Sequence, residues 1–435
     1  MRPGYSKESI SGLPPVRVVV VGAGLQGVST AHELARRGCE VTVLERDTGP
    51  ALATSYANAG MLTPSMADPW NAPGIVRQLL GYLGREDAPF LLRPSALPSL
   101  LGWGLAFIRH SSPRRYREHM RANLQLASYS LSILRELRQA HGLDFDQRAN
   151  GTIKVFRDRR AFDAGVARND LLRELGLDVR ALDGAGAVAV EPALAPIQSQ
   201  LVGAIHCPVD ESGDAHAFTK GLAQAARGLG ARFRFGCAVT GFERAGDRVV
   251  AVLTDQGRIA ADDFVLAAGS WSPQLVSGLR LGVPVRPVKG YSITVDTSAW
   301  RGAPRMPVID DALHAAATPL GTRLRVAGTA EIAGYDTALT PARIDNLFAL
   351  LLGLFPTYTP HLERARALPW AGLRPVCADG VPLIGASRIS NLHLNTGQGH
   401  LGWTLAAGSA RLLVDLMLCA TPALDPAPYD AKRRV

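Results

Sequence analysis

The sequence of 435 residues has few cysteines and no long apolar run. Its five cysteines form no Cys-x-x-Cys pair, which argues against a zinc knuckle or a disulfide framework and favours a reducing compartment. The first seventeen residues lack an apolar segment, so we expect no secretory signal. The longest apolar stretch, Leu97–Ile108, contains a proline and two glycines. It is shorter than the roughly 18 residues that span a bilayer, so we expect a cytoplasmic protein.

Lysine is also scarce: only five of the 47 basic residues are lysines, and the formal net charge is +9. An excess of basic charge can indicate a nucleic-acid or anionic-membrane partner. The arginines are scattered along the chain, with short clusters such as 114–117, and we expect no nucleic-acid partner. For residues 97–117 two alternatives stay open: a peripheral contact with the inner membrane, or a buried helix that covers the substrate domain. We favour the buried helix.

Nothing in the composition indicates disorder or low complexity. The hydrophobic share is 47% and the charged share 20%, which is typical of a globular enzyme. The 44 glycines and 29 prolines are spread along the chain rather than gathered in repeats. A chain of this length predicts two or three domains, or one large α/β unit with an insertion.

The strongest local pattern is a βαβ unit at the N-terminus. An apolar strand, Val16–Val21, runs into Gly22-Ala23-Gly24-Leu25-Gln26-Gly27, a helix follows, and Glu40–Glu45 forms a second strand. The glycines allow a tight turn, close approach to a pyrophosphate and close packing of the helix on the strand. Glu45 stands 18 residues after Gly27, where a carboxylate binds a ribose and disfavours the 2′-phosphate of NADP.

Two later segments favour a flavin over a nicotinamide dinucleotide. Val265–Ser272 is an apolar strand that runs into a turn of small residues, and Leu392–Thr404 is a strand, a glycine-rich turn and the start of a helix. A second helix N-terminus suits the pyrimidine end of a flavin, where negative charge develops, whereas a nicotinamide enzyme does not need one. We therefore predict FAD as the cofactor.

The first and last thirds of the chain share this strand–turn–helix order, which indicates one domain made of separated segments. We predict an α/β fold, with a Rossmann-type FAD-binding domain and an inserted α+β substrate domain on a mostly antiparallel sheet. The expected segments are a disordered extension at 1–15, the FAD-binding domain at 16–72, 200–280 and 376–420, the substrate domain at 73–199 and 281–375, and a C-terminal tail at 421–435.

Seven blocks occur in order along the chain: Gly22–Gly27, Ala53–Gly60, Glu191–Leu194, Asp210–Asp214, Pro287–Ser292, Gly372–Pro375 and Leu394–Thr404. In these blocks, residues 16–420 resemble the small, FAD-containing subunit of bacterial D-amino-acid dehydrogenase, within the D-amino-acid oxidase/glycine oxidase group. The resemblance implies FAD and oxidative deamination of a D-amino acid to the 2-oxo acid and ammonia, by hydride transfer to the flavin. It also implies that electrons pass to a quinone or another membrane carrier rather than to dioxygen.

The resemblance also implies roles for individual residues. Arg374 would clasp the substrate carboxylate, for which a guanidinium has a matching fork of donors. Tyr291 would give its hydroxyl to that carboxylate or line the side-chain pocket, and His314 is a third candidate catalytic residue. The predicted cofactor-binding residues are Val21, Gly22, Gly24, Leu25, Gln26, Gly27, Glu45, Arg46, Ser55, Asn58, Ala59, Gly60, Val239, Ala268, Gly269, Gly397, Gly399, His400, Leu401, Gly402, Trp403 and Thr404. We predict no metal site.

Two departures from the family pattern leave the substrate open. Leu313-His314 stands where the dehydrogenase subunits usually have a Tyr-Lys pair, and Gln398 and His400 stand where they have His and Thr. Preference for the usual small neutral D-amino acids is therefore not implied. One alternative keeps the fold but oxidises a secondary amine such as D-hydroxyproline or sarcosine. Another is a flavin-binding partner subunit without amine chemistry.

Overall fold

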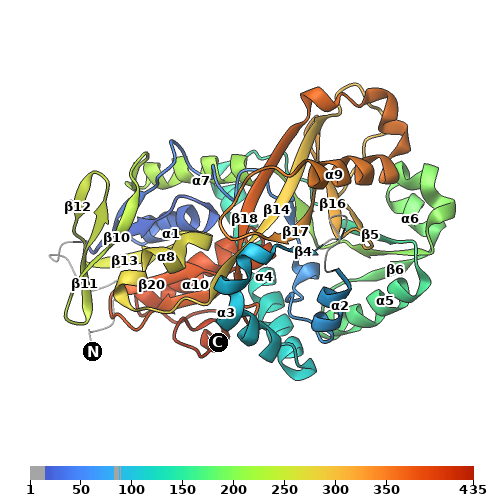
Figure 1. Ribbon diagram of the computed structural model, residues 1–435. Helices are drawn as coiled ribbons and strands as arrows, with labels where there is room; N and C mark the ends of the chain where they lie inside the picture. Colours follow the sequence, from blue (N-terminus) through green and yellow to red (C-terminus); the bar gives the residue numbers. More distant parts are fainter. Residues whose placement is uncertain (1–14, 83–87, 89) are drawn as a thin grey trace.

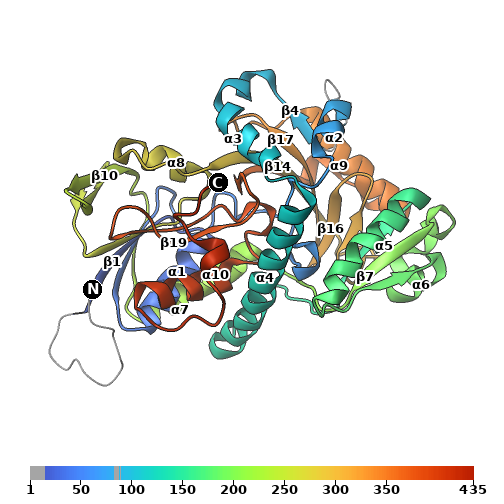
Figure 2. The ribbon, with the colours of Figure 1, turned by 90° about the horizontal axis from the view of Figure 1, so that it is seen from below.

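Two large sheets lie side by side in the computed structural model, which describes residues 15–82, 88 and 90–435 (Figures 1 and 2). The first sheet has six strands in the order β19-β20-β13-β1-β2-β9. Five of them run parallel: β1 (Arg17–Val21), β2 (Glu40–Leu44), β9 (Arg232–Arg234), β13 (Asp263–Leu266) and β20 (Leu392–Thr396). The edge strand β19 (Leu383–Ala386) is antiparallel to β20.

After the exposed Arg17, strand β1 consists of four buried valines, because both faces of its sheet are covered. Val18 and Val20 pack into a core with the helices of one face, and Val19 and Val21 pack into a core on the other face. The first face carries α1 (Leu25–Arg36), α4 (Pro113–His141), α7 (Ala215–Gly228) and α10 (Ala406–Met417). The other carries α8 (Ser272–Leu275) and an antiparallel sheet of β10 (Val239–Ala245), β11 (Arg248–Thr254) and β12 (Gly257–Ile259).

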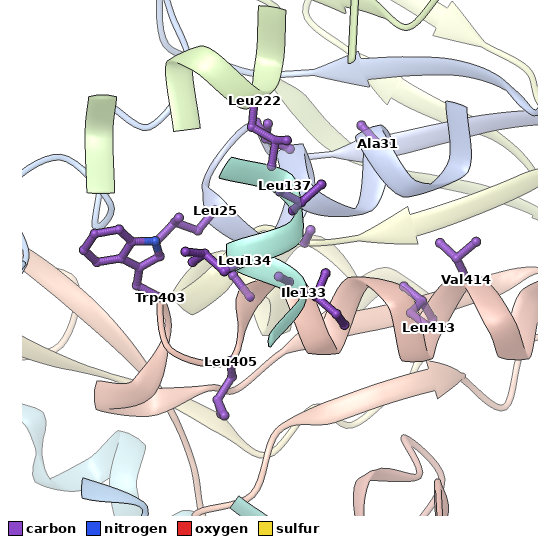
Figure 3. Close-up of a cluster of buried hydrophobic side chains, with 14 of the residues drawn as sticks. Leu25, Ala31, Ile133, Leu134, Leu137, Leu222, Trp403, Leu405, Leu413 and Val414 are labelled. Carbon is purple, nitrogen blue, oxygen red and sulfur yellow. The ribbon is translucent and has the colours of Figure 1, made fainter. Parts of the chain in front are cut away.

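The helical face is one continuous hydrophobic cluster. Figure 3 shows side chains from all four helices and from the turn before α10 gathered together, among them Leu25, Ala31, Ile133, Leu134, Leu137, Leu222, Trp403, Leu405, Leu413 and Val414. The long helix α4 begins where the hydroxyl of Ser112 accepts a hydrogen bond from the Arg115 amide, and it ends at Gly142 in the left-handed conformation.

The second sheet has nine strands in the order β18-β14-β17-β16-β15-β5-β7-β6, with β4 paired to β17. The strands are β4 (Phe90–Leu92), β5 (Thr152–Phe156), β6 (Arg180–Leu182), β7 (Gly203–Cys207), β14 (Val285–Asp296), β15 (Val308–Asp310), β16 (Ala315–Leu320), β17 (Arg323–Ile332) and β18 (Leu368–Cys377). Six of its eight strand pairings are antiparallel. The predicted fold class, with a mostly antiparallel second sheet, is confirmed.

Shorter elements complete the second body. Helices α5 (Arg159–Glu174), α6 (Gly184–Val190) and α9 (Pro341–Leu354) pack on the nine-stranded sheet, and α2 (Ile75–Tyr82) and α3 (Leu97–Arg109) lie at one margin of the molecule (Figure 2). Between the two large sheets, β3 (Met61–Leu62) pairs with β8 (Glu211–Ser212).

The proposed division into domains needs two changes. Strand β7 follows the boundary placed at residue 200, yet it pairs with β5 and β6 in the nine-stranded sheet. Helix α4 lies within 73–199, yet its apolar side chains pack with α1 and α10 against the six-stranded sheet. We therefore propose that α4 belongs with the FAD-binding segments and β7 with the substrate segments. The expectation for residues 1–15 falls, except for residue 15, outside the described residues.

The apolar stretch at 97–108 is a helix, but the prediction that it is buried is wrong for half of its side chains. Leu100, Trp103 and Phe107 are buried in a core with β14, β17 and β18. Leu101 and Leu105 are 72% and 71% exposed. Overall hydrophobicity could not distinguish a helix packed on one face from a helix packed all round.

The segment 421–435 is tied to the body of the protein. Tyr429 is buried, and its hydroxyl donates a 2.7 Å hydrogen bond to the carbonyl of Ala122 in α4. The guanidinium of Arg433 donates to both carboxylate oxygens of Asp379, at 2.8 and 3.0 Å. A side chain that is buried and hydrogen-bonded in this way contributes to stability.

We expect Tyr429→Phe to lower the free energy of unfolding by about 1 kcal/mol, since it removes the hydrogen bond that the buried hydroxyl donates. A urea titration followed by circular dichroism measures the change. The control is Tyr56→Phe, because Tyr56 is 42% exposed and its replacement should change stability by less than about 0.5 kcal/mol. Equal midpoints for the two variants would show that the tail is not part of the core.

Candidate functional site

A cavity of about 1260 Å³ lies between the two sheets. The turn after β1 and the loop 51–60 line it from one side, and strands β14, β16, β17 and β18 line it from the other. Ligand pockets are usually about 300–1,000 Å³, so this cavity has room for a large cofactor and a second small molecule.

The turn between β1 and α1 brings backbone very close to backbone. A Cβ on Gly27 would stand 1.8 Å from the carbonyl oxygen of Gly22, and a Cβ on Gly22 would stand 2.7 Å from the oxygen of Ala267. Gly24 differs, because a Cβ there would meet only the Ser55 hydroxyl, at 3.4 Å, and the residue lines the cavity. Gly24, the residue before α1, has no side chain to cap the helix, and the Leu25 amide donates to the Ser55 hydroxyl at 3.3 Å. The other amides of the first turn point toward the N-terminal end of the helix, where an anion binds favourably.

Glu45 follows β2 and lines the same part of the cavity. Its Oε2 accepts a 2.7 Å hydrogen bond from the Ala23 amide and its Oε1 a 3.0 Å bond from the Asp47 amide. Burial raises the pKa of the Glu45 carboxyl above its usual value, and the two amide hydrogen bonds oppose this only in part. The carboxylate is thus held beside the glycine turn, where it can accept from the hydroxyls of a ribose.

The loop 51–60 connects the two sides of the cavity. Toward the first sheet, the Ser55 hydroxyl accepts a hydrogen bond from the Leu25 amide at 3.3 Å. Toward the second, the carbonyl of Ala57 accepts from Ser292 at 2.8 Å and that of Ala59 from Thr318 at 2.7 Å. Within the loop, Asn58 Oδ1 accepts from the Gly60 amide at 3.0 Å. Ser55 of this loop is therefore held by α1, which packs on the first sheet, and Ala57 and Ala59 are held by strands of the second sheet.

The turn after β20 closes the cavity near the second sheet. His400 Nε2 lies 3.1 Å from the carbonyl of Met66, and its ring stacks on Trp70 with centroids 5.3 Å apart. Burial lowers the pKa of His400, which favours the neutral ring at pH 7. The Gln26 side-chain amide donates to the Gly402 carbonyl at 2.6 Å, which joins this turn to α1. Helix α10 begins at Ala406, two residues later than expected.

The predicted cofactor residues divide into two groups. Those on the cavity wall are Gly24, Leu25, Gln26, Glu45, Ser55, Asn58, Ala59, Gly60, Gly269, Gly399, His400, Gly402 and Trp403. Off the wall lie Val21, Gly22, Gly27, Arg46, Val239, Ala268, Gly397, Leu401 and Thr404. Several of these shape the wall without forming it. Gly22 and Gly27 permit the close turn, and the Thr404 hydroxyl accepts from the Thr63 amide at 3.0 Å.

Arg374 is a cation in the cavity wall. It lies on β18 opposite Val288 of β14, and its Nη1 donates to the carbonyl of Thr329 at 3.0 Å. Among the described residues, no carboxylate oxygen lies within 4 Å of its guanidinium. Burial lowers the pKa of Arg374 to about 10. A cation in this setting can accept a carboxylate ligand that restores its lost solvation.

Gly290 makes the position of Arg374 possible. A Cβ on this glycine would stand 2.2 Å from Arg374 Nη1 and 2.3 Å from its Cζ, so the guanidinium occupies the space that any side chain at 290 would fill. The Trp70 ring lies 5.7 Å from the guanidinium carbon. Trp70 follows Asp68-Pro69 in a loop without a motif, so no sequence pattern selects it as a site residue.

Tyr291 does not offer its hydroxyl hydrogen to the cavity. It is buried, and the hydroxyl donates to Glu331 Oε2 at 2.6 Å and lies 3.0 Å from the Thr340 hydroxyl. Glu331 is held in turn by Arg93 at 2.6 Å. A hydroxyl has one hydrogen to donate, so the expected donation from Tyr291 to a substrate carboxylate is wrong. The residue lines the cavity, and this second expected role stays a prediction.

His314 lies at the rim of the cavity, in the turn between β15 and β16. It is exposed and has φ +45°. Five further charged residues line this side: Asp68, Lys154, Arg168, Asp310 and Asp311. Lys154 could have been selected from the sequence, because a lysine stands between Ile153 and Val155 in strand β5.

The site fits a dinucleotide with an adenosine and a second large ring. The first turn of α1 and the open face of Gly24 would hold the pyrophosphate, and Glu45 would hold a ribose. The loop 54–60 and the turn at 399–402 would border the ring system beside Arg374. A family model described as FAD dependent oxidoreductase (DAO) matches residues 17–416.

The chain belongs to the DAO family of FAD-dependent oxidoreductases. FAD is therefore the cofactor that this site holds. Curated relatives named D-amino acid dehydrogenase include one from Rhodopseudomonas palustris, 41% identical over 94% of this chain and 96% of its own length. Another, from Cereibacter sphaeroides, is 42% identical over 97% of this chain and 96% of its own length.

Solved structures of the same fold are more distant in sequence. Glycine oxidase from Geobacillus kaustophilus superposes with a TM-score of 0.75 at 23% identity, over 97% of this chain and all of that one. L-proline dehydrogenase from P. horikoshii gives a TM-score of 0.75 at 20% identity, over 96% of this chain and 98% of that one. These likenesses confirm the fold.

We expect Gly27→Ala to lower the affinity for FAD at least tenfold, because the new methyl group cannot stand 1.8 Å from the Gly22 oxygen and α1 must move. Reconstitution of the apoprotein with FAD, followed by protein fluorescence, measures the dissociation constant. Gly228→Ala is the matched control, since a Cβ at this position in α7 meets nothing within 4 Å. Wild-type affinity in the Gly27 variant would contradict the role of this turn.

Proposed function

We propose that this protein is a D-amino-acid dehydrogenase: it oxidises a D-amino acid to the imino acid, which water converts to the 2-oxo acid and ammonia. The proposal is supported by the unpaired guanidinium of Arg374 in the wall of a cavity that fits FAD. The names of the relatives at about 41% identity support the D-amino-acid substrate. We also propose that electrons pass to a quinone and that the enzyme acts on the cytoplasmic side, in peripheral contact with the inner membrane.

Bound FAD would supply the chemistry, by taking a hydride from the substrate Cα and later delivering two electrons to the acceptor. The chain's own contribution is positioning. Arg374 would hold the carboxylate in a two-point hydrogen bond, and Trp70 and His400 would limit the directions in which the substrate can lie. Holding the reacting atoms in a near-attack geometry removes much of the entropic barrier.

The substrate amine has to be neutral as the hydride leaves, because its lone pair forms the new C=N bond. The neutral His400 ring adds no positive charge beside the amine. If the amine enters deprotonated, no side chain has to act as a base. Arg374 would bind the carboxylate and take no proton. We further propose that Tyr291 lines the side-chain pocket and that His314 acts at its outer end, on the charged rim.

An anaerobic screen tests the function directly. Purified FAD-loaded protein is mixed with D- and L-amino acids, D-hydroxyproline and sarcosine, and loss of the visible flavin absorbance is followed. We expect D-amino acids to bleach the flavin, and reoxidation to be faster with a water-soluble quinone than with dioxygen. Bleaching by secondary amines alone would show that the substrate is a secondary amine and not a D-amino acid with a primary amine. No bleaching by any amine would overturn the proposal.

We expect Arg374→Leu to raise the KM for a D-amino acid about 10²–10³-fold, because a charge-assisted two-point contact contributes about 3–4 kcal/mol. FAD content should stay at the wild-type level, which absorbance of the purified variant measures. Gly290→Ala gives an independent check, since its methyl group displaces the guanidinium without removing it. An unchanged KM in both variants would exclude the carboxylate role.

The pKa of Arg374 predicts how ligand binding depends on pH. A carboxylate binds the protonated guanidinium, whose pKa is lowered to about 10. Binding is therefore at full strength below that pH and weakens about tenfold for each unit above it. Propanoate, which has no amine to titrate, is the suitable ligand, and its dissociation constant is read from the perturbed flavin spectrum. Affinity that stays constant to pH 11 would show that another group binds the carboxylate.

A further inference from the structure

Helix α3 presents a row of leucine and isoleucine side chains to the outside of the molecule. We call Leu97, Leu101, Leu105 and Ile108 the α3 stripe. Their side chains are 47%, 72%, 71% and 49% exposed, and Leu101 and Leu105 are the most exposed large hydrophobic residues in the described chain. Their spacing places them on one face of the helix. Figure 2 shows α3 at the margin of the molecule, beside α2.

The α3 stripe is part of the rim of the cavity. All four of its residues line the cavity that extends inward to Gly290 and Arg374, and so does Val76 of α2, which is 41% exposed. Beneath them, Leu100 and Trp103 are buried and anchor α3 to the second sheet. Exposed apolar surface at the mouth of a binding cavity indicates contact with a partner rather than a packing defect.

Basic residues follow the stripe without a balancing number of acids. Residues 109–121 contain five arginines and one glutamate, and Glu118 pairs with Arg114 at 2.9 Å. The Arg115 guanidinium donates to the carbonyl of Arg109 at 3.0 Å, so this basic segment starts at the end of α3. An apolar helix face beside unpaired arginines matches the boundary between the acyl chains and anionic headgroups of a membrane.

The opposite side of the rim is charged. Asp68, Lys154, Arg168 and His314 line the cavity there, from a loop, from β5, from α5 and from the turn before β16. Burial raises the pKa of Asp68, but the nearby cations Arg168 and Lys154 lower it more, so these residues form one charged cluster. One cavity thus has an apolar rim and an ionic rim, formed by different elements.

We propose that the α3 stripe and Val76 rest in the interface of an anionic membrane, and that the apolar rim admits a lipid-soluble electron acceptor to the flavin. The zwitterionic amino acid enters past the charged rim, which faces water. This inference rests on the proposed function and adds the surface and the two entry sides. Within the described residues, no helix is long and apolar enough to cross a bilayer, so the contact is interfacial.

Vesicle flotation tests the surface without any turnover. FAD-loaded enzyme is mixed with vesicles of phosphatidylcholine containing 30% phosphatidylglycerol, or of phosphatidylcholine alone, and floated on a sucrose gradient. We expect wild-type enzyme to float with the anionic vesicles, and Leu101→Gln/Leu105→Gln to lose at least 80% of the floating fraction. Arg109→Gln/Arg117→Gln should float less with the anionic vesicles than wild type. Added salt should lower the floating fraction of wild type and change that of this variant little.

The matched control is Leu368→Gln. Leu368 is 65% exposed but stands on β18 outside the cavity lining, so its replacement should leave flotation unchanged. Replacing exposed leucines with glutamine should not impair folding, and FAD content confirms this for each variant. Wild-type enzyme that fails to float, or equal loss in the Leu368 variant, would overturn the proposal. So would a smaller molar mass of the Leu101/Leu105 variant in light scattering, which would assign the stripe to a second copy of the chain.

A second measurement separates the surface from the function. We expect Leu101→Gln/Leu105→Gln to be bleached by D-amino acids like the wild type and to keep turnover with a short-chain, water-soluble quinone. Turnover with a long-chain quinone in anionic vesicles should fall at least tenfold. If the Leu101→Gln/Leu105→Gln variant keeps its turnover with the long-chain quinone, the acceptor does not enter past the α3 stripe. A wild-type enzyme that no amino acid bleaches contradicts the proposed function, while flotation still decides the membrane surface.

Discussion

The loop 51–60 is the constraint on which the cavity depends. Its Ser55 hydroxyl accepts from the start of α1, and the carbonyls of Ala57 and Ala59 accept from strands of the nine-stranded sheet. The two sheets have large cores of their own, and they also meet where Val285 and Cys377 pack against the six-stranded sheet. A loop hydrogen-bonded on both sides fixes the distance between the cofactor cradle on one sheet and Arg374 on the other, and hydride transfer depends on that distance.

Much of the fold could be read from the sequence because the signals are local. The apolar strand β1, the glycine turn and Glu45 lie within 30 residues, and each has one physical interpretation in that order. Helix α9 also follows a local pattern, since Pro341 at its first position favours a helix start and an apolar period follows. The family resemblance is confirmed by relatives about 41% identical. Local patterns do not give the partners of a side chain, so Tyr291 was expected to donate to a ligand although Glu331, 40 residues later, takes its hydrogen.

The partners of the charged residues were likewise not given by local sequence patterns. Many of the arginines that make the sequence basic are paired with carboxylates, such as Arg135 and Arg138 with Glu211. Composition and charge could not separate these from Arg374, which only the family resemblance selected and which has no carboxylate within reach among the described residues. What distinguishes Arg374 is a position across the sheet: it lies diagonally beside Gly290, which leaves the space for it. Only the register of β14 and β18 brings these residues together, so the site follows from strand pairing and not from composition.

The topology of the six-stranded sheet also limits when it can assemble. Val18 of β1 pairs with Asp263 of β13, and β13 pairs with Leu392 of β20, so neighbours in space are separated by hundreds of residues in the chain. During synthesis β1 is made first, but its central neighbour becomes available only after more than half of the chain has been translated. The dinucleotide cradle therefore matures late, and nascent chains that stop before residue 396 lack β20 and the turn that closes the cradle.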